Sequence, residues 1–331
     1  EPLDRTKQFD FARLYYTAFS RPQNLLVLTA QEREGHGRTP SKYLERAYRS
    51  AAPWKGGDFR WGDVELEDVK PVNLKKQYSF TSHIAVYETC PLQYKFYKEL
   101  EFAPVRNAAP LFGTLVHQTI EDIHKAVLRG EPQRVTADAV EEWLHRNYQT
   151  LASAQRSYLA PRQVEAALGH VQRYRERHQG AWDRVVEAEV DVSLVKENYI
   201  LQGQVDLIRG EGGTVELVDF KSEQKPDVND PANEERLRRY QRQLEAYAHI
   251  IQERTGREVS RMHLYYTGEK DGNPYISYPK DSANIQATIR EFDAVVERIQ
   301  AKDFGLGGVQ VPRKTCQECD MKHYCRKVER N

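Results

Sequence analysis

The chain has 331 residues, and its 49 lysines and arginines are balanced by 49 aspartates and glutamates. A formal net charge of zero excludes nucleic-acid binding through overall positive charge, so any such binding must come from local patches. The sequence has no run of about 18 apolar residues, which excludes a transmembrane helix. Four cysteines are too few for a disulfide scaffold, and we expect a reducing, cytoplasmic environment.

The first 78 residues predict a small unit followed by a linker. Aromatic and apolar residues at helical spacing predict a helix over 9–19, and the run NLLVLT predicts a buried strand over 24–29. Residues 31–77 are polar with scattered glycine and proline, which is typical of a linker, and a short helix is expected near 41–50. The composition changes at Ser79. No signal-peptide pattern opens the chain. The first residue is Glu1 and the only methionines are Met262 and Met321, so we expect a fragment or a trimmed chain.

Helices dominate the stretch that follows. Capping residues and apolar periodicity predict helices over about 82–89, 110–129, 136–150 and 161–180. In the second of these, His117, Glu121 and His124 fall on one helical face. A histidine and a glutamate four residues apart on a helix can bind a metal ion, although an ordinary polar helix face produces the same pattern.

Three alternating apolar segments predict an antiparallel meander over 185–196, 199–209 and 214–222. Side chains two residues apart on a strand face the same side, so Asp219 and Lys221 share a face while Phe220 points to the other. Pairing of the last two strands brings Asp206 close to Asp219. Two carboxylates beside a lysine fit a site for a hard cation and a positioned water. An ion pair on a half-exposed hairpin is the alternative.

Residues 234–254 form the strongest predicted helix. Its apolar residues repeat at intervals of three and four, and Gln243 and Tyr247 are neighbours at the edge of that stripe. Basic residues near a helix start oppose the helix dipole, so the arginines there predict contact with an anion such as phosphate. They are Arg236, Arg238, Arg239 and Arg242. Strands over 261–267 and 275–278 and a helix over 282–302 complete the core.

The four cysteines predict a metal site. Cys316, Cys319 and Cys325 lie close together near the end of the chain, and Cys90 lies far upstream. A C-x2-C pair with two further thiolates is typical of zinc or iron–sulfur binding, and the pattern leaves these two open, with free buried cysteines as the third reading. A metal would fasten the two ends of the domain together and contribute folding free energy.

Six polar positions and the four cysteines occur in an order that resembles the RecB-like branch of the PD-(D/E)xK nucleases. The resemblance is strongest to the iron–sulfur members found in AddB- and AdnB-type helicase–nucleases. These positions are His117, Asp206 (which follows Gly203), Asp219, Lys221, Gln243, Tyr247, Cys90, Cys316, Cys319 and Cys325. The resemblance covers residues 79–331. It implies an α+β fold with a restriction-endonuclease-like core, in which helices flank a central mixed sheet and a four-cysteine cluster joins the two ends. Val218 replaces the proline that names the superfamily.

The resemblance also implies a role for each position. Asp206, Asp219, His117 and the Phe220 carbonyl would bind Mg²⁺ or Mn²⁺, and Lys221 would polarise the attacking water. Gln243 and Tyr247 match the QxxxY motif, which supports the site and touches DNA. The four cysteines match the ligands of a [4Fe-4S] cluster, with Zn²⁺ as the alternative.

The beginning of the chain resembles a different family. The sequence YTAFSRPQNLLVLTA is similar to the last conserved motif of UvrD-like superfamily 1 helicases, in which an arginine reaches the γ-phosphate of ATP. Arg21 is the matching position, and Pro22-Gln23 departs from the usual pattern. The chain has no GxxxxGK[ST] phosphate loop, so we expect no ATPase activity from this chain alone. We therefore expect a helicase remnant over 1–50, a linker over 51–78 and a nuclease domain over 79–331.

These resemblances imply a metal-dependent deoxyribonuclease that cuts single-stranded DNA or DNA ends. It would be the nuclease part of a helicase–nuclease in DNA repair, recombination or defence. Its partners would be DNA and the helicase motor of a longer parent chain or another subunit, without a membrane, in the cytoplasm at the nucleoid. Two alternatives stay open, a DNA-binding scaffold with a silent nuclease site and a zinc-stapled domain that binds only proteins.

Overall fold

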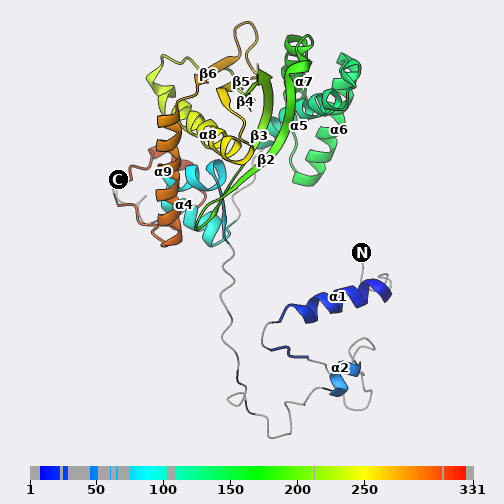
Figure 1. Cartoon of the computed structure of the whole chain (residues 1–331), viewed down its shortest axis with the longest axis vertical. Helices are drawn as coiled ribbons and strands as arrows, with labels where there is room; N and C mark the ends of the chain where they lie inside the picture. The colour runs from blue at the N-terminus through cyan, green and yellow to red at the C-terminus, as the bar shows by residue number, and fades with distance from the viewer. Residues whose placement is uncertain are drawn as a thin grey trace. The chain divides into compact units, whose positions relative to one another are not determined.

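The protein was examined as a computed structural model. The structure describes residues 8–22, 25–28, 45–50, 60, 65, 75–102, 109–211, 213–307 and 309–325. The chain divides into two units, Glu1–Leu74 and Lys75–Asn331 (Figure 1). Among the described residues, no helix is both long enough and apolar enough to cross a membrane.

The smaller unit contains helices α1 (Gln8–Ser20) and α2 (Glu45–Ser50). The helix predicted over 9–19 is therefore present, and Arg21 follows it as an exposed residue. The strand predicted over 24–29 is wrong where it can be checked, because residues 25–28 have no regular structure and Leu25 is 42% exposed. A short apolar run becomes a strand only when another strand pairs with it, and the run itself does not specify that partner. Residues 24 and 29 lie outside the described part.

The larger unit is built on a six-stranded mixed sheet, which confirms the expected α+β class with a central mixed sheet flanked by helices. Its strands are β1 (Gln77–Ser79), β2 (Val185–Val195), β3 (Ile200–Glu211), β4 (Thr214–Lys221), β5 (Val259–Tyr266) and β6 (Tyr275–Pro279). The predicted meander is present, because β2, β3 and β4 pair antiparallel in turn. The β1–β3 and β4–β5 pairs are parallel, and β5–β6 is antiparallel. The predicted linker over 51–78 lies mostly outside the described residues, and its last two positions belong to β1.

Strand β3 changes partner along one of its edges. β1 pairs with residues 200–202 of β3, and β4 pairs with residues 207–211. Residues 203–206 lie between these two segments. On the opposite edge β2 pairs with β3 along most of its length. The sheet therefore opens where β1 and β4 separate, and Asp206 stands at the beginning of the β4 side.

Helices cover both faces of the sheet (Figure 1). One face packs against α5 (Ala109–Leu128), α6 (Ala137–Gln155) and α7 (Pro161–His178), around a core that includes Leu115, Leu144 and Phe220. The other packs against α8 (Pro231–Thr255) and α9 (Ser282–Gln300), around Leu217, Leu244 and other apolar side chains. The remaining helical segments are η3 (Phe80–Ile84), α3 (Ala85–Thr89), α4 (Pro91–Tyr94), η4 (Lys95–Glu99), η5 (Pro132–Arg134), η6 (Trp182–Arg184) and α10 (Arg313–Glu318).

Helix α8 has clear signals at both ends. The Asp230 side chain accepts a hydrogen bond from the N–H of Ala232, Pro231 occupies the first turn, and Gly256 ends the helix with a φ of 68°. The predicted boundary at residue 234 was late because it began at the apolar repeat. The apolar stripe then lies against the sheet and orients Gln243 and Tyr247 toward it.

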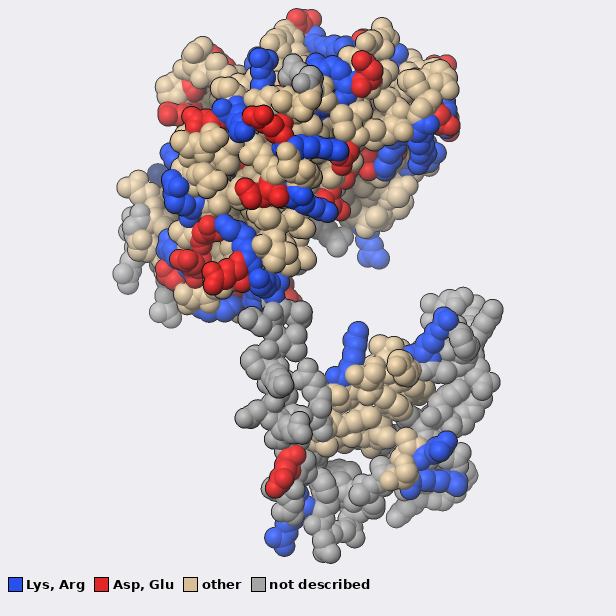
Figure 2. All heavy atoms as spheres, in the orientation of Figure 1, with Lys and Arg blue, Asp and Glu red and all other residues tan. Residues whose placement is uncertain are grey.

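The arginines at the start of α8 have a different explanation from the one predicted. Arg242 makes two 2.8 Å hydrogen bonds to Glu88 and a 3.0 Å ion pair with Glu291, while the ion-pair partners of Arg236 and Arg239 are Glu223 and Glu235. The protein's own carboxylates therefore supply anions for three of the four arginines. On the face of the larger unit shown in Figure 2, acidic and basic residues are interspersed. The arginines at the start of α8 therefore give no support for contact with a phosphate.

Close packing between β3 and α8 leads to a stability prediction. A Cβ at position 203 would lie 2.3 Å from Cε1 of Tyr247, so Gly203→Ala is expected to lower the free energy of unfolding by about 1–3 kcal/mol. Urea denaturation followed by circular dichroism measures this change. The matched control is Gly180→Ala, whose Cβ meets no atom within 4 Å. Equal midpoints for the two variants would contradict the packing argument.

Candidate active site

Two carboxylates from neighbouring strands meet beside the opening in the sheet. Asp206 comes from β3, and its Oδ2 accepts a 2.6 Å hydrogen bond from the main-chain N–H of Phe220 on β4. Asp219 comes from β4 and is 5% exposed. Burial and the charges of Asp219 and Glu189 raise the pKa of Asp206 well above its ordinary value. The hairpin therefore brings Asp206 and Asp219 together, as the alternation of residues predicts.

Lys221 is the cationic group of this site. Its Nζ lies 2.5 Å from Oδ2 of Asp219 and 4.0 Å from the centroid of the Tyr240 ring on α8. Burial alone would lower the pKa of Lys221, but the charge of Asp219 outweighs it and the pKa is raised. The ammonium is therefore charged and held between a carboxylate and the face of an aromatic ring.

Gln243 and Tyr247, both on α8, support the Asp219 side chain through hydrogen bonds. Nε2 of Gln243 donates to Oδ1 of Asp219 at 2.9 Å and to the Tyr247 hydroxyl at 3.0 Å. The ring of Tyr247 packs on Gly203. The i, i+4 spacing on α8 thus serves to fix the orientation of one carboxylate.

His117 approaches from the opposite side of the sheet, on α5. Its Nδ1 lies 3.6 Å from Oδ2 of Asp206, and its ring meets that of Phe220 edge to face. Burial lowers the pKa of His117 against the opposing charge of Asp219, so the imidazole is neutral at neutral pH. His124, about two helical turns further on, instead shares a 2.7 Å hydrogen bond with the Tyr174 hydroxyl in the core.

Glu189 and Tyr240 are site residues that the sequence reasoning missed. Glu189 lies on β2 between two positions that pair with residues 205 and 207 of β3, which places it opposite Asp206, and its φ is 49°. Burial, with the charges of Glu121 and Asp219, raises the pKa of Glu189 to about 7. Its position depends on a local departure from strand geometry, which the alternating pattern of β2 conceals. Tyr240 could have been found from its spacing, since it lies one helical turn before Gln243.

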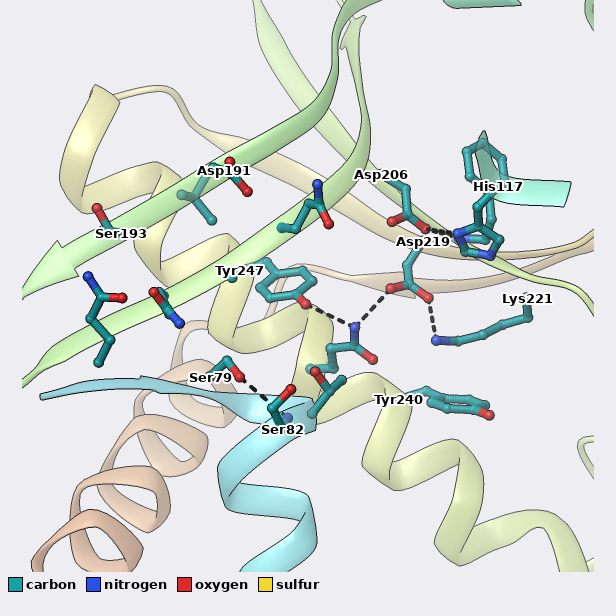
Figure 3. Close-up of a pocket in the computed structure, with 18 residues that line it drawn as sticks. Ser79, Ser82, His117, Asp191, Ser193, Asp206, Asp219, Lys221, Tyr240 and Tyr247 are labelled. Carbon is teal, nitrogen blue, oxygen red and sulfur yellow. Dashed lines mark hydrogen bonds and ion pairs between the residues drawn. The ribbon is translucent and has the colours of Figure 1, made fainter. Parts of the chain in front are cut away.

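One cavity of about 700 Å³ is lined by His117, Asp206, Asp219, Lys221, Tyr240, Gln243 and Tyr247, but not by Glu189 (Figure 3). His117, Asp206, Asp219 and Lys221 lie at one end, with Tyr240 on the same side. Figure 3 shows Asp191 and Ser193 on the side of Tyr247 away from Lys221, and Ser79 and Ser82 below Tyr247. Six of the residues predicted for the site, including Gln243, are therefore brought together. Arg21 belongs to the smaller unit and is not among the residues that line this cavity.

The donor atoms suit a hard divalent cation. Carboxylate and carbonyl oxygens are the ligands that Mg²⁺ prefers, and two or three are enough because it retains water. The pKa of Asp206 is raised because the carboxyl is buried beside other carboxylates. A bound cation would offset that negative charge. Within the described residues, no set of three or more His, Cys, Asp or Glu side chains is arranged to hold a metal ion as it stands.

The four cysteines line a second, small cavity of about 30 Å³. Cys90 precedes α4, Cys316 lies on α10, and Cys319 and Cys325 follow α10. None of the four is in a disulfide. Burial raises the pKa of Cys90, and the charges of Cys325 and Cys316 add to the effect. Cysteines more than 200 positions apart in the chain thus line the same cavity, although their thiols are not arranged to hold a metal ion as they stand.

Fold and site together define the class of protein. A mixed sheet flanked by helices, with two carboxylates and a lysine on adjacent strands, is consistent with a restriction-endonuclease-like core. The sequence profile described as "PD-(D/E)XK nuclease superfamily" matches residues 80–326. The chain belongs to this superfamily.

Solved structures give a further comparison. The fold is similar to that of a candidate exonuclease from Eubacterium rectale, with a TM-score of 0.50 at 14% identity, covering 76% of this chain and 88% of that chain. A second structure, SSO0001, is 16% identical over 71% of this chain and 94% of its own, and its TM-score of 0.31 carries no argument. No curated protein matches the sequence.

The raised pKa of Glu189 predicts a pH-dependent effect on stability. Glu189 loses its proton near pH 7 in the folded protein and near its ordinary value of 4.5 when unfolded, so wild type loses stability as pH rises between these values. In buffer with a chelator, Glu189→Gln is expected to be more stable than wild type above pH 7, by at most about 3 kcal/mol, and to lose that advantage below pH 4.5. Thermal unfolding across this range measures the difference.

The matched control for this experiment is Glu197→Gln, which changes an exposed glutamate in the turn between β2 and β3. Its stability difference from wild type is expected to stay constant with pH. A constant difference for Glu189→Gln as well would show that Glu189 has an ordinary pKa.

Proposed function

We propose that the larger unit is a metal-dependent DNA nuclease that hydrolyses phosphodiester bonds of single-stranded DNA or DNA ends. The observation that carries this proposal is the placement of Asp206, Asp219 and Lys221 in one cavity of a chain that belongs to a nuclease superfamily. Nucleases of this superfamily generally use Mg²⁺ or Mn²⁺. Asp206, Asp219 and the Phe220 carbonyl are the proposed ligands, with His117 on the α5 side.

The chemistry follows from these groups. Asp206 and Asp219 would hold a divalent cation, which when bound would screen the anionic phosphodiester and lower the pKa of the attacking water. Lys221 donates a hydrogen bond to that water or to a nonbridging phosphate oxygen, and Asp219 and Tyr240 fix its ammonium in place. Gln243 holds the Asp219 carboxylate so that the other oxygen faces Lys221.

A silent scaffold site is the alternative function. In a silent site we would expect one of the charged groups to be replaced or displaced. Here Asp219 keeps its hydrogen bond to Gln243 and its ion pair with Lys221, and both lie within the cavity. These contacts favour the active enzyme.

We further propose that the four cysteines hold a [4Fe-4S] cluster, as in the AddB-type nucleases that the sequence resembles, with Zn²⁺ as the alternative. The support is their gathering around one cavity without a disulfide. Such a cluster would connect the beginning and the end of the nuclease domain, as the sequence analysis predicts.

The relation to a helicase is also a proposal. The motif around Arg21 supports a parent in which a UvrD-like helicase, with its ATP site elsewhere, feeds DNA to this nuclease domain. The chain contains no phosphate loop, so we propose that it has no ATPase activity by itself. A role in DNA repair, recombination or defence, in the cytoplasm at the nucleoid, follows from this assignment.

Loss of one carboxylate tests the catalytic assignment. Asp219→Asn is expected to lower the rate of Mg²⁺- or Mn²⁺-dependent cleavage of single-stranded DNA at least about 100-fold, because it removes a charged metal ligand. Release of acid-soluble fragments from labelled DNA measures the rate. Asp183→Asn changes an exposed aspartate before β2 and should retain wild-type activity. Unchanged cleavage by a folded Asp219→Asn protein would refute the assignment.

Metal analysis tests the cysteine assignment. Anaerobically purified protein is expected to be brown and to contain about four irons and four sulfides per chain. Cys90→Ser should lose most of both because it removes one ligand. A colourless wild type with one zinc per chain would support the zinc alternative, and a metal-free wild type would contradict both.

A further inference from the structure

The cavity extends beyond the groups that the chemistry requires. Past Tyr247 it continues over the ends of β1, β2 and β3 (Figure 3). We call this part the polar limb, lined by Gln77, Ser79, Thr81, Ser82, Ser193 and Gln202. All six side chains are uncharged hydroxyls or amides. A volume of about 700 Å³ for the whole cavity falls in the range of sites that take one small ligand, so the two parts together suit a short piece of a single strand.

Strand pairing sets the polar limb. Ser193 of β2 stands opposite Gln202 of β3, and Gln202 pairs in turn with Ser79 of β1. Three polar side chains from three adjacent strands therefore form one row across the sheet. Thr81 and Ser82 continue the row at the start of η3 and are exposed. Because the row rests on paired backbone, its geometry is fixed before any ligand arrives.

The charge of the lining indicates which part of a nucleotide belongs there. Among the described residues that line the cavity, Lys221 is the one lysine or arginine, and it lies at the far end beside Asp219. Asp191, which is exposed, adds a carboxylate next to the polar limb. Among the described residues that line the limb, a phosphate would meet Asp191 and no lysine or arginine. Phosphate sites in proteins are instead built from cationic side chains.

Amides and hydroxyls instead match bases and sugars. A glutamine side chain offers an acceptor and two donors, and a hydroxyl both donates and accepts. Such groups can satisfy the hydrogen-bonding edge of any base, provided that the base is not paired with another strand. The lining therefore fits an unpaired nucleoside without selecting its sequence.

We propose that the polar limb is a nucleoside subsite, which holds the base and sugar of an unpaired nucleotide adjoining the phosphate that is cut. This inference rests on the proposed nuclease function. It assigns the contacts on that nucleotide to Gln202, Ser193 and the hydroxyls at the start of η3, and it leaves charge neutralisation to the opposite end of the cavity.

Two substrates distinguish binding of the nucleoside from hydrolysis of the phosphodiester. Bis(p-nitrophenyl) phosphate is a phosphodiester without base or sugar, whereas oligothymidylate of eight residues has both. For the double variant Ser193→Ala/Gln202→Ala we expect KM for the oligonucleotide to rise about tenfold with little change in kcat, because two neutral hydrogen bonds are lost. The rate on bis(p-nitrophenyl) phosphate should stay within about twofold of wild type. The matched control, Ser282→Ala/Gln286→Ala, changes exposed residues of α9 outside the cavity and should alter neither substrate.

Two further measurements exclude a merely structural effect. The slope of log KM against log salt concentration should be the same for the double variant and wild type, because no phosphate contact is lost. Ser193→Trp removes no buried partner and fills the limb from an exposed position, and it should raise KM for the oligonucleotide in the same way.

The outcomes are distinct. If wild type cleaves both substrates and the variants behave like wild type on the oligonucleotide, the subsite is refuted and the nuclease function stands. If the variants lose activity on both substrates equally, the limb serves the catalytic end and the inference is also refuted. If wild type cleaves neither substrate with Mg²⁺ or Mn²⁺, the proposed function fails and the inference fails with it.

Discussion

The site depends on the break in backbone pairing along one edge of β3. Between the segments that pair with β1 and β4, main-chain groups need other partners, because a buried unpaired N–H costs about 1–3 kcal/mol. Asp206 accepts the N–H of Phe220 on β4, which has no partner on β3 beyond the break. A side chain proposed for catalysis thus also completes the sheet. Its position follows from the same requirement that shapes the fold.

Electrostatics is the second constraint. Asp206, Asp219 and Glu189 gather negative charge, and Lys221 is the cation that contacts Asp219. Burial is the main cause of the raised pKa values of Asp206 and Glu189, and the neighbouring carboxylates add to it. Protonation reduces this negative charge in one way, and a divalent ion would offset it in another. Because metal binding requires deprotonated carboxylates, affinity for such an ion should increase with pH. His117 adds no positive charge, since its burial keeps it neutral.

Local patterns predicted much of this site because its parts lie on short repeats. The two-residue alternation of Asp219 and Lys221, and the four-residue spacing of Gln243 and Tyr247, specify which side chains share a face. Long-range pairing was not accessible in this way. The parallel partners β1 and β5, the carboxylates that pair with Arg236 and Arg242, and the φ of Glu189 all depend on segments distant in sequence. The prediction of a strand over 24–29 was wrong at residues 25–28 for the same reason, because an apolar run does not specify the strand with which it would pair.

The gathering of Cys90 with the three late cysteines has a consequence for synthesis of the chain. Under the proposed metal link, the bond closes a loop of about 230 residues and would reduce the conformational freedom of the unfolded chain by about 5 kcal/mol of free energy. Cys90 leaves the ribosome long before Cys325, so at roughly 5–20 residues per second it waits ten seconds or more for its partners. A chain truncated before α10 would contain the whole proposed catalytic site and lack this closure. The proposed metal link would therefore stabilise only a chain whose synthesis has passed Cys325.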